Sequence, residues 1–194
     1  MTGVRSVCVY CGSSLGHDHR YRETAGALGR LIGEAGIELV YGGGNIGLMG
    51  VIADAVIAAG GRVTGVIPDD LKRAELAHEE LHELVVVDSM HARKRSMFER
   101  ADAFIVLPGG PGTLDETIEI ITWRQLRLHD KPIVILDDGD YWRPLIALFE
   151  HTIAHGFARD SFRGLFTVVG EVDAVLPTLA GLGPSHRRAK PDRL

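Results

Sequence analysis

Continuous apolar runs and amphipathic stretches alternate along the whole chain. The apolar runs at residues 104–107 and 133–136 contain no polar residue, which is typical of strands covered on both faces. We expect strands at residues 5–11, 37–41, 62–67, 84–88, 102–107, 132–137 and 165–169, and helices at 18–35, 46–60, 90–101, 114–128, 141–155 and 172–180. This alternation predicts an α/β fold with a single doubly wound parallel sheet, Rossmann-like, and helices on both faces.

The turn that leads into the helix predicted at 114–128 is the most distinctive segment. Residues 108–116 read Pro-Gly-Gly-Pro-Gly-Thr-Leu-Asp-Glu. Unpaired N–H groups at a helix N-terminus, open to close approach through glycines, form a ready site for a phosphate. The carboxylates of Asp115 and Glu116 would repel a phosphate, so they suggest chemistry at a sugar beside it. The competing interpretation is a capping box, in which Thr113 and Glu116 only satisfy the first N–H groups of the helix.

Two further turns are expected at the same edge of the sheet, because the carboxyl ends of parallel strands meet there. The segment after the second strand contains Gly42-x-Gly44-x-x-Gly47, which is the spacing of a dinucleotide-binding turn. Such a turn normally follows the first strand, so we take Gly43 and Gly44 as candidate substrate contacts without a dinucleotide. After the first strand, Ser13 offers a hydroxyl and a backbone amide, either to a ligand or as a cap for the next helix.

The helix that precedes the glycine turn carries basic side chains beside its apolar stripe. At about 100° per residue, Met90, Met97 and Ala101 align, and Arg93 and Lys94 fall within about 60° of them. Basic side chains at such an edge either extend along the apolar surface to solvent or reach into a cleft. Because the carboxylate-bearing turn follows soon after, we favour a role for Arg93 and Lys94 in the cleft.

The helix that follows the glycine turn is apolar on two sides. One side carries Leu114, Ile118, Ile121 and Leu128, and the other carries Ile120 and Trp123. A helix of this kind is usually buried twice, so we expect the sheet on one side and a second copy of the chain on the other. Glu116 is close in angle to Trp123. The pattern therefore predicts a homodimer with its active site near the subunit interface.

Length, charge and cysteine content mainly exclude classes of function. The chain has 194 residues, which suits one nucleotide-binding domain over 1–182 and a disordered basic tail over 183–194. A net charge of −5 argues against nucleic-acid binding. No apolar run reaches the length of a membrane span and no signal peptide is recognisable, so we expect a cytoplasmic protein.

Cys8 and Cys11 should face opposite sides of a strand and act as apolar fillers. The histidines show no metal-ligand spacing.

Taken together, these motifs resemble those of the LONELY GUY (LOG) family, the cytokinin riboside 5′-monophosphate phosphoribohydrolases. The resemblance rests on P-G-G-x-G-T-x-x-E at residues 108–116 and on supporting blocks at 11–14, 41–44, 65–68, 90–94, 121–123 and 129–132. It implies hydrolysis of the N-glycosidic bond of an adenosine 5′-monophosphate, typically substituted at N6. The products would be the free cytokinin-type base and ribose 5-phosphate, with no metal or organic cofactor.

The resemblance also implies roles for individual residues. Arg93 and Glu116 match the catalytic pair of the family. Its substrate-binding positions match Glu75, Arg93, Lys94, Gly110, Pro111, Gly112, Thr113, Leu114, Asp115, Glu116 and Thr122. A carboxylate such as that of Glu116 would stabilise positive charge on the ribose and align or deprotonate water. Arg93 would either orient Glu116 or bind phosphate.

Three other functions use similar residues. A non-catalytic nucleotide or cofactor carrier would need the same sheet and the same glycine turns, because a fold does not decide function. A lysine decarboxylase would need a lysine in a Schiff base with pyridoxal phosphate, and the four lysines, at 72, 94, 131 and 190, lie in no recognisable cofactor motif. A dinucleotide-dependent reductase is disfavoured by the position of its glycine turn.

Overall fold

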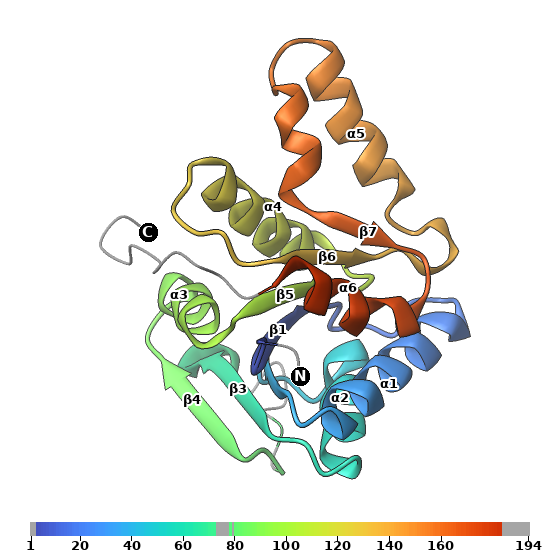
Figure 1. Cartoon of the computed structure of the whole chain (residues 1–194). Helices are drawn as coiled ribbons and strands as arrows, with labels where there is room; N and C mark the ends of the chain where they lie inside the picture. Colours follow the sequence, from blue (N-terminus) through green and yellow to red (C-terminus); the bar gives the residue numbers. More distant parts are fainter. Residues whose placement is uncertain (1–2, 73–77, 79, 184–194) are drawn as a thin grey trace.

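A single seven-stranded parallel sheet forms the centre of the molecule (Figure 1). The computed structural model describes residues 3–72, 78 and 80–183. Every neighbouring pair of strands is parallel, in the order β4-β3-β2-β1-β5-β6-β7. The strands are β1 (Ser6–Tyr10), β2 (Glu38–Tyr41), β3 (Val63–Pro68), β4 (Glu83–Val87), β5 (Ala103–Val106), β6 (Ile133–Leu136) and β7 (Thr167–Val169). All seven predicted strands are confirmed.

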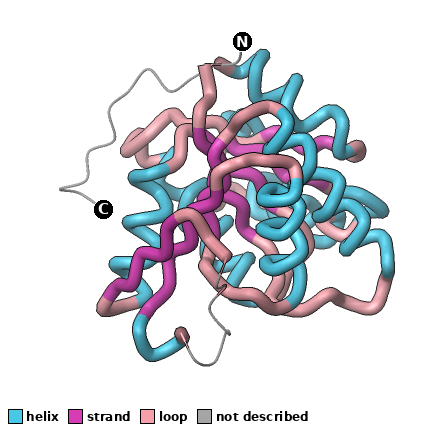
Figure 2. The backbone as a smooth tube through the Cα atoms, turned by 90° about the horizontal axis from the view of Figure 1, so that it is seen from below, coloured by secondary structure: helices cyan, strands magenta, loops and turns pink. Residues whose placement is uncertain are grey.

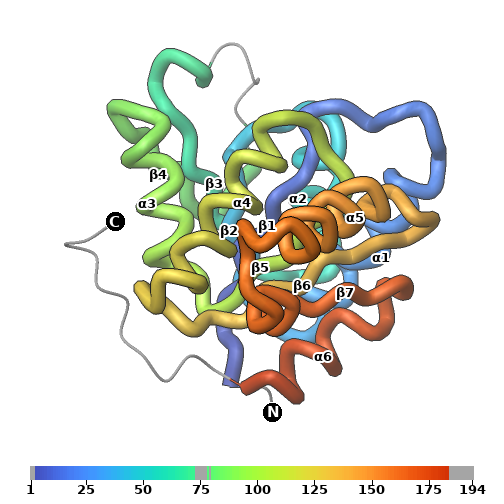
Figure 3. The backbone as a smooth tube through the Cα atoms, turned by 90° about the horizontal axis from the view of Figure 1, so that it is seen from above, coloured from blue at the N-terminus to red at the C-terminus, as the bar shows by residue number. Residues whose placement is uncertain are grey.

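Helices cover both faces of the sheet (Figures 2 and 3). They are α1 (His19–Glu34), α2 (Gly47–Ala58), α3 (Met90–Arg100), α4 (Pro111–Gln125), α5 (Arg143–Ala154) and α6 (Val175–Leu182). Buried side chains of α1, α2 and α6 share one apolar core with the sheet, and those of α3, α4 and α5 share a second. The doubly wound fold with helices on both faces is therefore confirmed.

The side chains of β1 alternate between the two cores. Val9 and Cys11 belong to the core under α1 and α2, whereas Cys8 and Tyr10 belong to the core under α3 and α4. This alternation follows from the two-residue period of a strand. Both cysteines are buried and unpaired, on opposite sides of the sheet. Their interpretation as apolar fillers is confirmed.

The path of the chain creates a crevice beside β1. The chain moves outward from β1 to β4 and then returns to place β5 on the other side of β1. Ligands of open α/β sheets bind at such a reversal, outside the carboxyl ends of the strands. The loops after β1 and β5 meet there, since the N–H of Gly12 donates to the carbonyl of Pro108 at 3.0 Å.

Helix α4 begins earlier than the sequence predicts. Its first residue is Pro111, and Gly110 stands at the N-cap without a side chain to cap the helix. Proline suits the first helical position because it lacks the N–H that would otherwise stay unpaired there. Thr113 is therefore inside the helix. The capping box of Thr113 and Glu116 is wrong.

The apolar sides of α4 are covered differently from the prediction. Ile120 is 1% exposed, and Trp123 is partly buried, with its ring edge-on to Phe98 at 5.1 Å between centroids. The side assigned to a second copy of the chain is thus partly covered within the monomer, and its contact with a second copy stays a prediction. The exposed apolar side chains of α4 are Ile118, which is 39% exposed, and Leu126, just past its end, which is 64% exposed.

Two predictions fall outside the described residues. Glu75 lies in the stretch 73–77, and the predicted tail also lies outside them, except for Gly183. Among the helices that the structure describes, none is both long and apolar enough to cross a membrane.

Candidate active site

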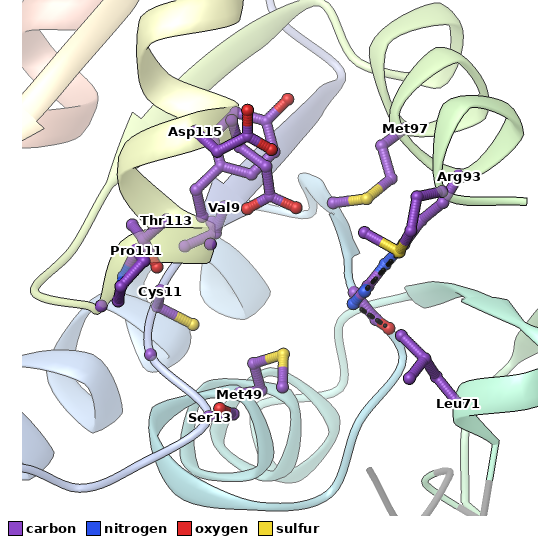
Figure 4. Close-up of a pocket in the computed structure, with 17 residues that line it drawn as sticks. Val9, Cys11, Ser13, Met49, Leu71, Arg93, Met97, Pro111, Thr113 and Asp115 are labelled. Carbon is purple, nitrogen blue, oxygen red and sulfur yellow. Dashed lines mark hydrogen bonds between the residues drawn. The ribbon is translucent and has the colours of Figure 1, made fainter. Parts of the chain in front are cut away.

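A cavity of about 240 Å³ opens beyond the carboxyl end of β1, between α3 and the first turn of α4 (Figure 4). The first turn of α4 and the loop after β1 form one wall, and α3 lies opposite. Of the predicted site residues, the cavity is lined by Ser13, Arg93, Gly110, Pro111, Gly112, Thr113, Asp115 and Glu116. Segments far apart in sequence therefore meet where the sequence predicts a site.

Other predicted residues do not line the cavity. Gly43 packs against β3, where an added Cβ would lie 3.3 Å from the Cβ of Ile67. The neighbouring Gly42 lines the cavity in its place. Gly44, Lys94, Leu114 and Thr122 are likewise absent from the lining.

Arg93 is held on the α3 side of the cavity by a backbone contact. Its side chain is buried, and Nη2 donates to the carbonyl of Gly42 at 2.8 Å. A Cβ on Gly42 would collide with this guanidinium and lie 3.1 Å from the Sδ of Met49. Glycine is thus required at position 42 so that the arginine can approach the backbone.

The second glycine turn packs against the first loop instead of surrounding a pyrophosphate. Gly47 has a φ of +64°, and an added Cβ there would lie 2.6 Å from the carbonyl oxygen of Ser13. The N–H of Leu48 donates to the carbonyl of Gly12 at 3.0 Å. The dinucleotide-like spacing therefore has two packing explanations, one at Gly42 and one at Gly47.

The glycine turn before α4 has a packed side and an open side. A Cβ on Gly109 would collide with the side chain of Thr113 and lie 2.9 Å from the backbone nitrogen of Gly12. A Cβ on Gly110 or Gly112 would meet no atom within 4 Å. The first bond of the helix runs from the N–H of residue 114 to the carbonyl of Gly110, so the N–H groups of Gly112 and Thr113 precede it. This open side has the character of an anion site.

Glu116 contributes a carboxylate to the cavity one turn into α4. Its side chain is partly buried. Burial raises the pKa of the Cys11 thiol, and the Glu116 carboxylate raises it further. Cys11 is therefore a neutral thiol that lines the same cavity as the Glu116 carboxylate.

Lys94 joins α3 to α4, which lie side by side (Figure 3). Its Nζ lies 2.6 Å from Oδ2 of Asp115 and 3.4 Å from Oε2 of Glu119. Burial acts to lower the pKa of Lys94, but the hydrogen bond to Asp115 and the charge of Glu119 outweigh it, so the pKa is raised. The ammonium is thus a fixed charge between the helices that carry Arg93 and Glu116.

Apolar side chains complete the lining, and the site prediction did not include them. The cavity is also lined by Met49, Met90, Met97 and Leu71. Met90 and Met97 lie on α3 with Arg93, and Leu71 lies near Arg93 (Figure 4). Methionine adapts its shape to flat or irregular apolar groups. The apolar stripe of Met90 and Met97 was recognisable in the sequence, but Met49 and Leu71 come from elements that only the fold brings there.

The segment 129–132 is hydrogen-bonded to both helices that border the cavity, α3 and α4. Nδ1 of His129 accepts from the N–H of Lys131, so Nε2 carries the proton that is donated to the carbonyl of Ile120 at 2.9 Å. Burial lowers the pKa of His129 to about 4. The Nζ of Lys131 donates to the carbonyl of Phe98 at 2.6 Å, and burial lowers the pKa of Lys131 to about 8. These bonds tie the start of β6 to α3 and α4.

Comparisons with known proteins identify the family of the chain. The family described as "Possible lysine decarboxylase" matches residues 49–179. A cytokinin riboside 5′-monophosphate phosphoribohydrolase of Rhodococcoides fascians is 43% identical over 176 residues, which cover 90% of this chain and 89% of the relative. The enzyme of the same name, LOG3, from Arabidopsis thaliana is 40% identical over 184 residues, which cover 95% of this chain and 86% of the relative.

Solved structures share the fold at lower identity. The molybdenum cofactor carrier protein of Chlamydomonas reinhardtii superposes with a TM-score of 0.69 at 20% identity, over 91% of this chain and 96% of the carrier. The decarboxylase description finds no counterpart in the cavity, because none of the described lysines lines it. By sequence, the chain belongs to the LOG family of cytokinin riboside 5′-monophosphate phosphoribohydrolases.

Proposed function

We propose that this protein hydrolyses the N-glycosidic bond of adenosine 5′-monophosphates substituted at N6, releasing the free base and ribose 5-phosphate. One observation carries the proposal: Glu116 lies in the same cavity as the open glycine turn, one helical turn further along α4. Four residues of α-helix rise about 6 Å, so a phosphate at Gly112 would leave room for a ribose beside Glu116. The 43% identity to the R. fascians enzyme supports the same reaction.

The chemistry follows from where the charges stand. As the bond between the ribose C1′ and the base nitrogen breaks, positive charge develops on the sugar, and the Glu116 carboxylate stabilises it. A water molecule adds its oxygen to C1′ and gives up a proton, which Glu116 can accept, and the base nitrogen takes up a proton from solvent as the C1′–N bond breaks. Glu116 then returns its proton to solvent, so that overall one water is divided between C1′ and the base. Arg93, fixed by Gly42, either orients Glu116 or binds the phosphate.

The methionine wall provides a place for the base. Met49, Met90 and Met97 offer polarisable apolar surface that suits a flat purine and an apolar N6 substituent. We assign the phosphate to the glycine side of the cavity and the base to this wall. Lys94 acts on the site through Asp115, which lines the cavity, and does not itself contact the substrate.

We further propose that the protein is a homodimer with its active site near the subunit interface. The support comes from two exposed apolar side chains, Ile118 on α4 and Leu126 at its C-cap, because α4 also carries Glu116. The buried unpaired thiols of Cys8 and Cys11 suit a reducing compartment such as the cytoplasm.

The proposal is tested by measuring the base released from AMP and from isopentenyladenosine monophosphate. Glu116→Gln should lower kcat by about a hundredfold or more, which is the usual loss for a group that stabilises a transition state. The matched control is Glu119→Gln, on the same helix but outside the cavity lining, which should keep most of the activity. The corresponding nucleosides should not be cleaved. Near-normal turnover in a well-folded Glu116→Gln protein would contradict the assignment, and nucleotide binding without release of base would identify a carrier.

A further inference from the structure

We infer that Tyr141 is a positioning residue that fixes the glycine turn for the phosphate. The inference rests on the proposed function. Tyr141 follows β6 and does not line the cavity. Its hydroxyl nevertheless donates to the carbonyl of Gly109 at 2.7 Å, across 32 residues of sequence. No motif in the sequence connects the two residues.

The geometry of the peptide bond explains why this contact matters. A trans peptide is planar, so the carbonyl of Gly109 and the N–H of Gly110 point in opposite directions. Gly110 lines the cavity and Gly109 does not. By holding the carbonyl on the outer side, the Tyr141 hydroxyl aims the N–H of Gly110 toward the cavity.

Without such an anchor this peptide would rotate readily. Glycine stands on both sides of it, and glycine adopts backbone conformations closed to other residues. The Gly109 Cα is packed against Thr113 and Gly12, which fixes the position of the turn. That packing holds Cα and leaves the orientation of the next peptide unset. The contact from Tyr141 supplies the missing restraint.

Tyr141 is itself held rigidly. Its ring packs edge-on against Tyr21 of α1 at 5.4 Å and against Trp142 at 4.9 Å between centroids. The N–H of Trp142 donates to the carboxylate of Asp137 at the end of β6. The hydroxyl is therefore placed by Tyr21 of α1 and by the segment after β6, neither of which lines the cavity. This is the arrangement expected of a residue that acts through another.

The test is Tyr141→Phe, which removes the hydroxyl and keeps the ring. Five quantities are measured: KM and kcat for AMP, the inhibition constants of ribose 5-phosphate and of adenine, and the melting temperature. We expect KM for AMP and the inhibition constant of ribose 5-phosphate to rise about tenfold, because the hydrogen bond from the Gly110 N–H to the charged phosphate would be weakened or lost. The inhibition constant of adenine should stay unchanged. The matched control, Tyr21→Phe, keeps the ring contact and should leave both inhibition constants unchanged.

The outcomes separate this inference from the proposed function. Equal weakening of ribose 5-phosphate and adenine, or a variant that does not fold, would show that the hydroxyl is only structural and would overturn the inference. Unchanged ribose 5-phosphate inhibition in Tyr141→Phe would overturn it while leaving the proposed function intact. A wild-type protein that neither releases base nor binds ribose 5-phosphate would overturn both.

Discussion

Replacing Gly112 with alanine tests whether the open side of the glycine turn holds a ligand. Gly112 is the second residue of α4, and a Cβ there meets no protein atom within 4 Å. Alanine stabilises a helix relative to glycine by up to about 1 kcal/mol. For a chain of this size that gain corresponds to a rise of about 2–4 °C in melting temperature. The protein alone therefore gives no reason for glycine at this position.

The proposed substrate does give a reason. A methyl group at Gly112 would occupy the space through which a phosphate oxygen approaches the N–H of the same residue. Losing one charged hydrogen bond costs about 1.5–3 kcal/mol, and kcat/KM for AMP should fall by about 10- to 150-fold. Gly112→Ala should thus be more stable and less active than the wild type.

Two further alanine variants frame this result. Gly109→Ala should unfold at a lower temperature, because its Cβ would lie 2.9 Å from the backbone nitrogen of Gly12. Gly164→Ala is the neutral control, since a Cβ there meets nothing within 4 Å and the residue lies outside the cavity lining. Melting curves and initial rates of adenine release provide both measurements. Full activity in Gly112→Ala would refute the phosphate site, and a lowered melting temperature would refute the account of the helix.

Three other expectations follow from particular contacts. Burial holds the pKa of His129 at about 4 against an ordinary value of 6.5. As the pH falls, His129 is therefore protonated at a higher pH in the unfolded chain than in the folded protein. The contribution of neutral His129 to the free energy of unfolding is complete above pH 6.5 and should decline by about 3 kcal/mol toward pH 4. Urea unfolding at several pH values should show a shallower decline for His129→Gln than for the wild type. Lys94→Met should lower kcat/KM less than Arg93→Met does, and the reverse order in steady-state kinetics would contradict the placement of Lys94 outside the cavity. Ile118→Lys combined with Leu126→Lys should sediment as a monomer at micromolar concentration, whereas a monomeric wild type would contradict the dimer.

The strands and the edge that carries the site were predictable because burial leaves a direct mark on the sequence. Residues 104–107 and 133–136 are uninterrupted apolar runs because both faces of a parallel strand are covered. The alternation of strands and helices then fixes the edge at which the turns gather, so the amino-acid pattern alone is enough to place Ser13, Gly110 and Glu116 together. Angular spacing similarly placed Arg93 at the border of its apolar stripe.

What covers a surface could not be predicted in the same way. The spacing of Ile120 and Trp123 shows that they share a side of α4, but it does not say that Phe98 of α3 packs there. The start of α4 was missed because Thr113 and Glu116 fit a local capping rule, while Gly110 and Pro111 satisfy the helix one turn earlier. In both cases several local solutions were compatible with the sequence, and tertiary packing selected one.

Glycine patterns show the same ambiguity and also how a structure resolves it. A glycine at a turn can be required by the protein, when a side chain would collide with it, or by a ligand, when a side chain would block the ligand. The two cases look alike in sequence. At Gly42 and Gly47 an added Cβ runs into Arg93 and the Ser13 loop, so packing alone accounts for them. At Gly110 and Gly112 an added Cβ meets nothing, although both residues line the cavity. Packing does not account for glycine at these two positions, whereas the phosphate that we propose to bind there would.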